Sequence, residues 1–206
     1  MRTIVTVAAA VVIGLLGAGG ARGQVLDRVV AIVGGQAITL SDVRAARQLQ
    51  LVATGGGDAE VIDRLVVREM MRTEVERFSV SPPSAAEIDA ALAAVRARLG
   101  ANAPAALDAV GLSESRLRAW IEDDGRITRY LDQRFDVAAQ PTDDEVLTWY
   151  RSREREFTKN GQPQPFEAVR SEVHVRLMAE RRQQLVDEWV AGLRRRTTVT
   201  LVPAGS

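Results

Sequence analysis

The sequence contains no cysteine, and this absence excludes several kinds of chemistry. A chain without thiols forms no disulfide, builds no zinc–thiolate site and has no thiol nucleophile. It has one histidine, His174, which lies between two valines, and a lone histidine supplies neither a proton relay nor a set of metal ligands. We interpret His174 as a partly exposed helix residue, expect no metal or cofactor, and expect packing alone to stabilise the fold.

Net charge is absent as well, because 27 basic residues balance 27 acidic ones. Nucleic-acid binding needs a concentrated basic face, for which this composition gives no support. Only 4% of the residues are aromatic.

The acidic pairs Asp123-Asp124 and Asp143-Asp144 could be imagined as acid–base catalysts. We interpret the first pair as a solvated helix face and the second as the negative first turn of a helix.

Residues 1–23 show the three consecutive regions of a secretory signal. Arg2 gives a weakly positive start, Ile4–Leu16 is apolar, and small residues precede a cut before Gln24. The alternative is an uncleaved anchor, because the uncharged stretch that begins at Thr3 approaches the length of a membrane span. Its glycines and short apolar core favour cleavage. We therefore expect export to the periplasm, with residues 24–206 forming one domain.

The most informative segment is Asp27–Val43, which predicts a strand, a tight turn, a second strand and a helix start. Gly34-Gly35 supplies the positive φ angles that a tight hairpin needs. Thr39, followed three residues later by Asp42, has the spacing of a helix-capping pair. The segment is therefore a β-hairpin that leads directly into a helix.

Apolar periodicity and capping signals predict helices along most of the remaining chain. They cover Ser41–Val52, Ala59–Phe78, about 84–99, a short turn at Leu107–Val110, about 113–135, about 142–150 and about 165–196. The helix Ala59–Phe78 is apolar nearly all round and should lie at the centre of the domain. We interpret its Met70 and Met71 as core residues, with an adaptable binding groove as the alternative.

The last helix changes its apolar face midway, which predicts two packing partners along one rod. The first set is Phe166, Val169, Val173 and Leu177, and the later set includes Leu185, Trp189 and Leu193. The β-branched residues after it predict a strand at 197–202. Because an isolated hairpin is marginally stable, this strand should join the N-terminal hairpin. The predicted fold is mainly α, with a small antiparallel sheet formed by the N-terminal hairpin and the C-terminal strand.

Several short motifs, in order along the chain, carry a family resemblance. They are Val29–Val43, Ile62-Asp63-Arg64-Leu65, Val80–Asp89, Gly111–Arg118, Pro141–Tyr150 and Pro165–Val199. Together they resemble the SurA/PpiC-like periplasmic chaperones, in particular the SurA N-terminal domain. Gly34 stands where this family usually has Asn, and both residues tolerate positive φ.

One large departure separates this chain from that family. Relatives insert one or two parvulin prolyl-isomerase domains where this chain has only residues 158–164. Seven residues cannot form a domain, which takes at least about 50 residues. The resemblance therefore implies a chaperone domain without its isomerase, and we expect the protein not to be an enzyme.

The resemblance implies that the protein is a periplasmic holdase, and we expect it to bind unfolded exported or outer-membrane proteins through an apolar helical cradle. Two alternatives remain open: a dimeric scaffold or accessory subunit with one fixed partner, or a family member labelled a peptidyl-prolyl isomerase. Because the later set of the last helix should be core, we expect clients to bind the first set and two neighbouring aromatic residues. These client-binding residues are Trp149, Tyr150, Phe166, Val169, Val173 and Leu177.

Overall fold

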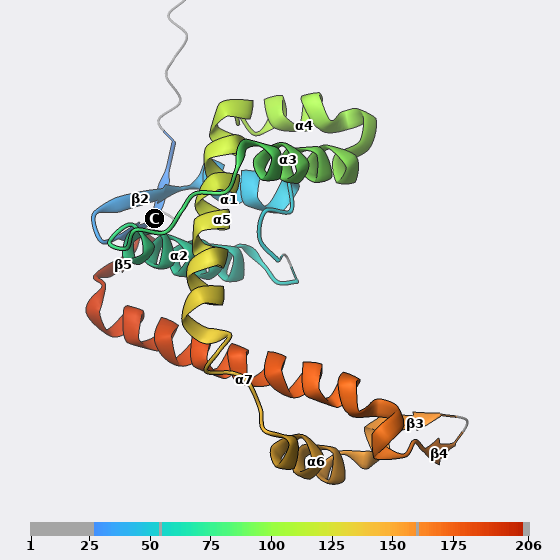
Figure 1. Cartoon of the computed structure of the whole chain (residues 1–206). Coiled ribbons are helices and arrows are strands. Elements are labelled where there is room, and N and C mark those ends of the chain that lie inside the picture. Colours follow the sequence, from blue (N-terminus) through green and yellow to red (C-terminus); the bar gives the residue numbers. More distant parts are fainter. Residues whose placement is uncertain (1–26, 54, 160, 204–206) are drawn as a thin grey trace, which may run out of the picture.

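The computed structural model describes residues 27–53, 55–159 and 161–203, so the expected signal segment 1–23 lies outside the described residues (Figure 1). The helices are α1 (Leu40–Gln48), α2 (Asp58–Val75), α3 (Ala85–Leu99), α4 (Ala103–Ala109), α5 (Glu114–Phe135), α6 (Asp143–Ser152) and α7 (Phe166–Arg196). The strands are β1 (Val29–Val33), β2 (Gln36–Thr39), β3 (Thr158–Lys159), β4 (Gln162–Pro163) and β5 (Val199–Leu201).

The two ends of the described chain meet in one antiparallel sheet, whose strand order is β2-β1-β5. Gly34 and Gly35, with φ angles of 56° and 92°, form the hairpin turn between β1 and β2. Val199 of β5 pairs with Val33 of β1, and the amide of Gly34 donates to the carbonyl of Thr198. The predicted mainly α fold with this small sheet is confirmed.

α2 lies at the centre of the main hydrophobic core, where it packs against α1, β1, α5 and α7. The buried residues of this core are Val30, Ala31, Val33, Ile38, Val43, Ala46, Val61, Leu65, Val66, Met70, Val75, Ile127, Tyr130, Phe135, Trp189 and Leu193. The prediction of a central second helix is therefore confirmed. A smaller cluster around Leu92, Val95 and Leu117 joins α3 and α4 to the first half of α5.

α7 has the two packing partners that its shifted apolar face predicts. Its C-terminal half places Trp189 and Leu193 in the main core, whereas its N-terminal half packs on α6. We call the unit of α6, the β3–β4 hairpin and residues 166–181 of α7 the arm. In Figure 1 the arm extends away from the rest of the molecule, and α5 connects it to α3 and α4 at the opposite end.

Capping boxes begin α1, α3 and α6, and the first of them is the predicted pair of Thr39 and Asp42. In each box the N-cap side chain (Thr39, Ser84 or Thr142) accepts from the backbone amide three residues ahead. The acidic side chain at that later position accepts in turn from the backbone amide of the N-cap residue.

Several boundaries differ from the prediction: α1 ends at Gln48 rather than Val52, α2 ends at Val75 rather than Phe78, and α4 begins at Ala103 rather than near Leu107. Alanine favours helix, and Pro104 occupies the first turn, where a missing N–H is not needed.

Candidate polypeptide-binding surface

The six residues predicted to bind clients do cluster, but mainly as the interior of the arm. Tyr150, Val169, Val173 and Leu177 are buried together with Val146 and Phe157 between α6 and α7. Trp149 and Phe166 pack against this cluster and remain partly exposed. The expectation of an exposed apolar surface is therefore wrong for the four buried residues, because α6 covers that face of α7. Contact between the set and a client stays a prediction.

Polar contacts close the arm around this cluster. The hydroxyl of Tyr150 donates to the carbonyl of Gln164, at 2.5 Å, which joins α6 to the segment before α7. The indole N–H of Trp149 donates to Glu180, at 3.1 Å, and the guanidinium of Arg153 lies 4.4 Å from the Trp149 ring centroid. The arm is thus a small packed unit, in which these aromatic side chains hold α6 on α7.

A depression of about 380 Å³ on the arm is lined by Trp149 and Leu177, and two further depressions with apolar linings lie on either side of α5. On one side, a depression of about 420 Å³ lies between α5, α2 and the segment after α1. Its apolar lining is Leu51, Val52, Ala53, Val67, Met71 and Ile127. Met70 is 2% exposed and belongs to the core, whereas Met71 lines this depression. The core interpretation is confirmed for Met70, and Met71 packs against the same core while also lining this depression.

On the other side of α5, a depression of about 490 Å³ lies between α5 and α3. Its apolar lining is Pro83, Ile88, Ala91, Ile121 and Gly125. Asp124 and Thr128 line both depressions, so the two are adjacent and separated only by this ridge of α5. We call the two depressions together the α5 groove.

Every charged residue that lines the α5 groove has an ion-pair partner within the protein. Arg64 pairs with Glu60, and Arg68 Nε lies 2.7 Å from Asp124. At the α3 side, Arg129 pairs with Glu87, at 2.7 Å. Asp132 pairs with Arg182 of α7, at 2.5 Å. The groove therefore presents apolar area and internally compensated charge.

The acidic pair Asp123-Asp124 is not the fully solvated face that the sequence indicated. Both side chains are half-buried and face Arg68, whose guanidinium stacks 3.5 Å above the ring centroid of Trp120. Arg68 also donates to the backbone carbonyl of Trp120, at 3.1 Å. Desolvation raises the pKa of both carboxyl groups, and the positive charge of Arg68 opposes that rise. The predicted solvation fails because α2 supplies a long basic side chain that no local pattern reveals.

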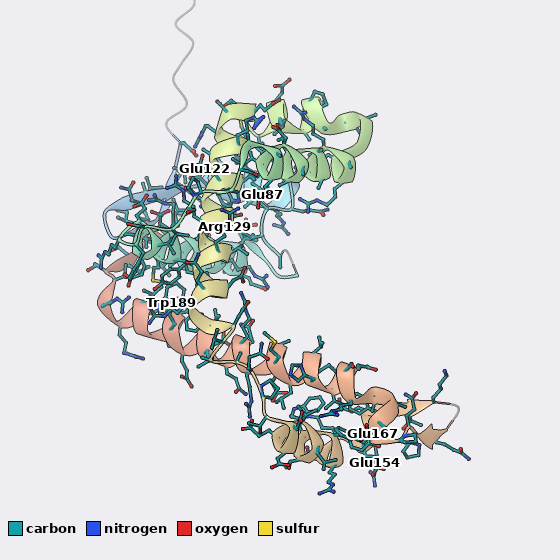
Figure 2. All side chains as sticks on the ribbon, viewed as in Figure 1. Glu87, Glu122, Arg129, Glu154, Glu167 and Trp189 are labelled. Carbon is teal, nitrogen blue, oxygen red and sulfur yellow. The ribbon has the colours of Figure 1, made fainter. Side chains whose placement is uncertain are left out.

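The α3 wall of the groove is fixed by a second set of contacts. Arg129 donates to both carboxylate oxygens of Glu87 and to the carbonyl of Pro82, at 2.7 Å (Figure 2). Gly125 allows the segment before α3 to approach α5 closely, because a Cβ at this position would lie 2.7 Å from Pro83 Cγ. Gly125 is thus where the segment before α3 packs on α5.

Two negative observations bear on other kinds of site. In the described parts of the chain, no group of three or more acidic or histidine residues is placed to hold a metal ion. Among the helices described, none is long and apolar enough to cross a membrane.

No protein-family model matches the chain, and no curated protein matches it. A solved structure of similar fold belongs to a pair of SurA-like chaperones from Campylobacter jejuni, the virulence factor PEB4 and the periplasmic protein Cj1289. The alignment has a TM-score of 0.55 and 14% identity, and covers 86% of this chain and all of the other. The chain has a SurA-like fold. At this identity the likeness shows the fold alone.

Proposed function

We propose that the protein is a periplasmic holdase-type chaperone, which binds unfolded segments of exported or outer-membrane proteins without catalysing a reaction on them. The observation that carries this proposal is the SurA-like fold, shared with a structure from a pair of SurA-like chaperones. The signal-like order of residues 1–23 supports export. The ordered motifs of the sequence support membership of the SurA/PpiC-like family.

We assign client binding to the α5 groove. A chaperone must keep apolar area accessible in its folded state, and two adjacent depressions with apolar linings meet that need. Met71 is a flexible, polarizable side chain at the edge of the core, suited to contact with varied partners. An extended segment that crosses the ridge at Thr128 would place apolar side chains in both depressions.

Aggregation measurements test this function directly. A chemically unfolded outer-membrane protein is diluted into buffer with or without the purified chain (residues 24–206), and light scattering is followed. We expect the chain to suppress scattering in a dose-dependent way. Ala91→Glu places a charge in the groove without removing a buried side chain, and should weaken the suppression.

Ala90→Glu is the matched control, because Ala90 is the exposed neighbour of Ala91 on α3 and does not line the groove. Ala90→Glu should retain the activity of the parent. If the parent fails to suppress aggregation of several unfolded proteins, the holdase function is wrong. A chain that binds one folded protein in fixed stoichiometry, and no unfolded one, would support the scaffold alternative.

A further inference from the structure

Three residues on one face of α7 become progressively more exposed towards the arm. Trp189, Arg182 and Val175 are spaced seven apart, so each lies about 20° around the helix from the next. Trp189, which Figure 2 labels near the lower end of α5, packs on Tyr130 of α5, with ring centroids 5.4 Å apart. Arg182 binds Asp132 of α5 and Asp136 just beyond its end, at 2.5 and 2.7 Å. Val175 is 64% exposed.

The face of α7 that carries Val175 is therefore the one that faces α5. Val173, Val169 and Leu177 point to the opposite side, where α6 covers them. Met178 and Ala179 flank Val175 one turn closer to Arg182, and Ala179 is exposed. Val175 and Ala179 thus present exposed apolar area along the arm, beyond the point where Arg182 binds α5. Met178 beside them is partly buried, and its sulfur accepts from Gln140 Nε2 at 3.5 Å.

We propose that Val175, Met178 and Ala179 form a second contact site for the client, continuous with the α5 groove. This inference rests on the proposed chaperone function. The continuity comes from Asp132, which lines the groove and binds Arg182. Val175 is two turns further along α7, about 10 Å, which about three residues of an extended client span.

The occupant that fits this surface is an uncharged, apolar stretch of extended polypeptide. Glu172 and Arg176, which flank Val175, pair with each other at 2.5 Å. The charges that line the groove are paired within the protein too. A charged segment would lose its hydration and find no free partner in the protein. An apolar segment has no charged group to remove from water. Binding should therefore change little with salt concentration.

The absence of cysteine permits a direct test by single-site labelling. A benzophenone is attached at Val175→Cys or at Ala191→Cys in otherwise unchanged chains. Ala191 is also exposed on α7, nine residues beyond Arg182, and so faces the opposite way. With an unfolded outer-membrane protein as client, cross-linking should be several-fold stronger from position 175 than from position 191.

An affinity measurement complements the cross-linking. Val175→Asp should weaken client binding by about tenfold, with an unchanged melting temperature because the side chain is exposed. Ala191→Asp should bind as the parent does. Equal cross-linking from both positions, or parental affinity of Val175→Asp, would overturn the inference while Ala91→Glu still tests the groove. A parent chain that binds no unfolded client overturns the proposed function itself.

Discussion

Arg129 of α5 and Glu87 of α3 are joined by an ion pair in which one guanidinium nitrogen lies 2.7 and 2.8 Å from the two carboxylate oxygens. The same carboxylate caps α3, because it accepts from the amide of Ser84. Glu145 repeats this arrangement at the start of α6, where Arg181 of α7 is its distant partner. In both places the start of a helix is also the contact that positions it against another helix.

This double role predicts acid sensitivity. Hydrogen bonds from Ser84 and then Arg129 lower the pKa of Glu87 from 4.5 to about 2, and Arg181 with Thr142 lowers that of Glu145 equally. Because the pKa values are lower in the folded state, the stabilisation is full above pH 4.5 and is lost as the pH falls towards 2. Urea unfolding at pH 7 and pH 3 should show this loss.

The control is a comparison of glutamine variants. The double variant Glu87→Gln, Glu145→Gln should be less stable than the parent at pH 7, and its stability should fall less between pH 7 and pH 3. Glu188→Gln, at an exposed position of α7, should follow the parent. An unchanged pH profile in the double variant would contradict the assignment.

Removal of the C-terminal strand should destabilise the whole domain. β5 pairs with β1, and Val199 packs against the main core. Deletion of residues 197–206 exposes one edge of β1 and part of that core, and should lower the free energy of unfolding by about 2–4 kcal/mol. Thermal melting followed by circular dichroism measures the effect. A melting temperature equal to that of the parent would show that the sheet closure contributes little.

The arm should be sensitive at the residues that we first expected to be exposed. Val173 is 0% exposed, so Val173→Ser removes methyl groups from the arm interior and buries a hydroxyl. A loss of about 2–3 kcal/mol is expected. Hydrogen exchange should locate this loss in α6 and the first half of α7. A fall in client protection in this variant therefore reports arm folding, and Val175→Asp is needed to test the surface.

The contrast between Val173 and Val175 illustrates what the sequence could predict and what it could not. Capping signals, the Gly34-Gly35 turn and the shift of apolar face along α7 are local patterns, and they correctly predicted the α-helices, the N-terminal hairpin and the end-to-end sheet. They did not predict the short β3–β4 hairpin, which lies where a loop was expected. Which face of α7 stays exposed depends on where α6 docks. That docking is decided by contacts such as Tyr150 with Gln164, which no periodicity reveals.

The same limit applies to the candidate site. The groove is lined from α2, α3, α5 and the segment after α1, and only the fold brings these elements together. Two lining residues were marked by the sequence, Met71 through its pairing with Met70 and Asp124 as part of an acidic pair. Ala91 belongs to the apolar stripe of its helix, and Thr128 carries no local signal, so neither residue by itself indicates a binding surface.

Prolyl isomerisation gives a separate test of the proposed function. Residues 158–164 include the short β3–β4 hairpin, at the place where relatives insert isomerase domains. We expect the chain not to accelerate cis–trans conversion of an X–Pro peptide, which takes tens of seconds or longer uncatalysed. Exchange rates measured by NMR with and without the chain provide the comparison. Turnover would place a catalytic site in the domain itself.

The last prediction concerns the ion pair between Arg68 and Asp124, both of which line the groove. Arg68 stacks on Trp120 and binds Asp124. Desolvation already raises the pKa of the Asp124 carboxyl group. Arg68→Gln removes the charge that opposes this rise, so the half-buried Asp124 carboxylate loses its partner. The variant should lose about 1–3 kcal/mol of stability at pH 7.

Part of that loss should return on acidification. A folded-state pKa above the unfolded value favours the folded state when the group is protonated, so stability is regained as the pH falls through the raised pKa. Asp124→Asn in the Arg68→Gln background removes the unpaired charge, and should restore stability at pH 7 and abolish the regain. Urea unfolding at pH 7 and pH 4 measures both effects. If the double variant is no more stable than Arg68→Gln, the loss comes from the missing contact with Trp120 rather than from the uncompensated carboxylate.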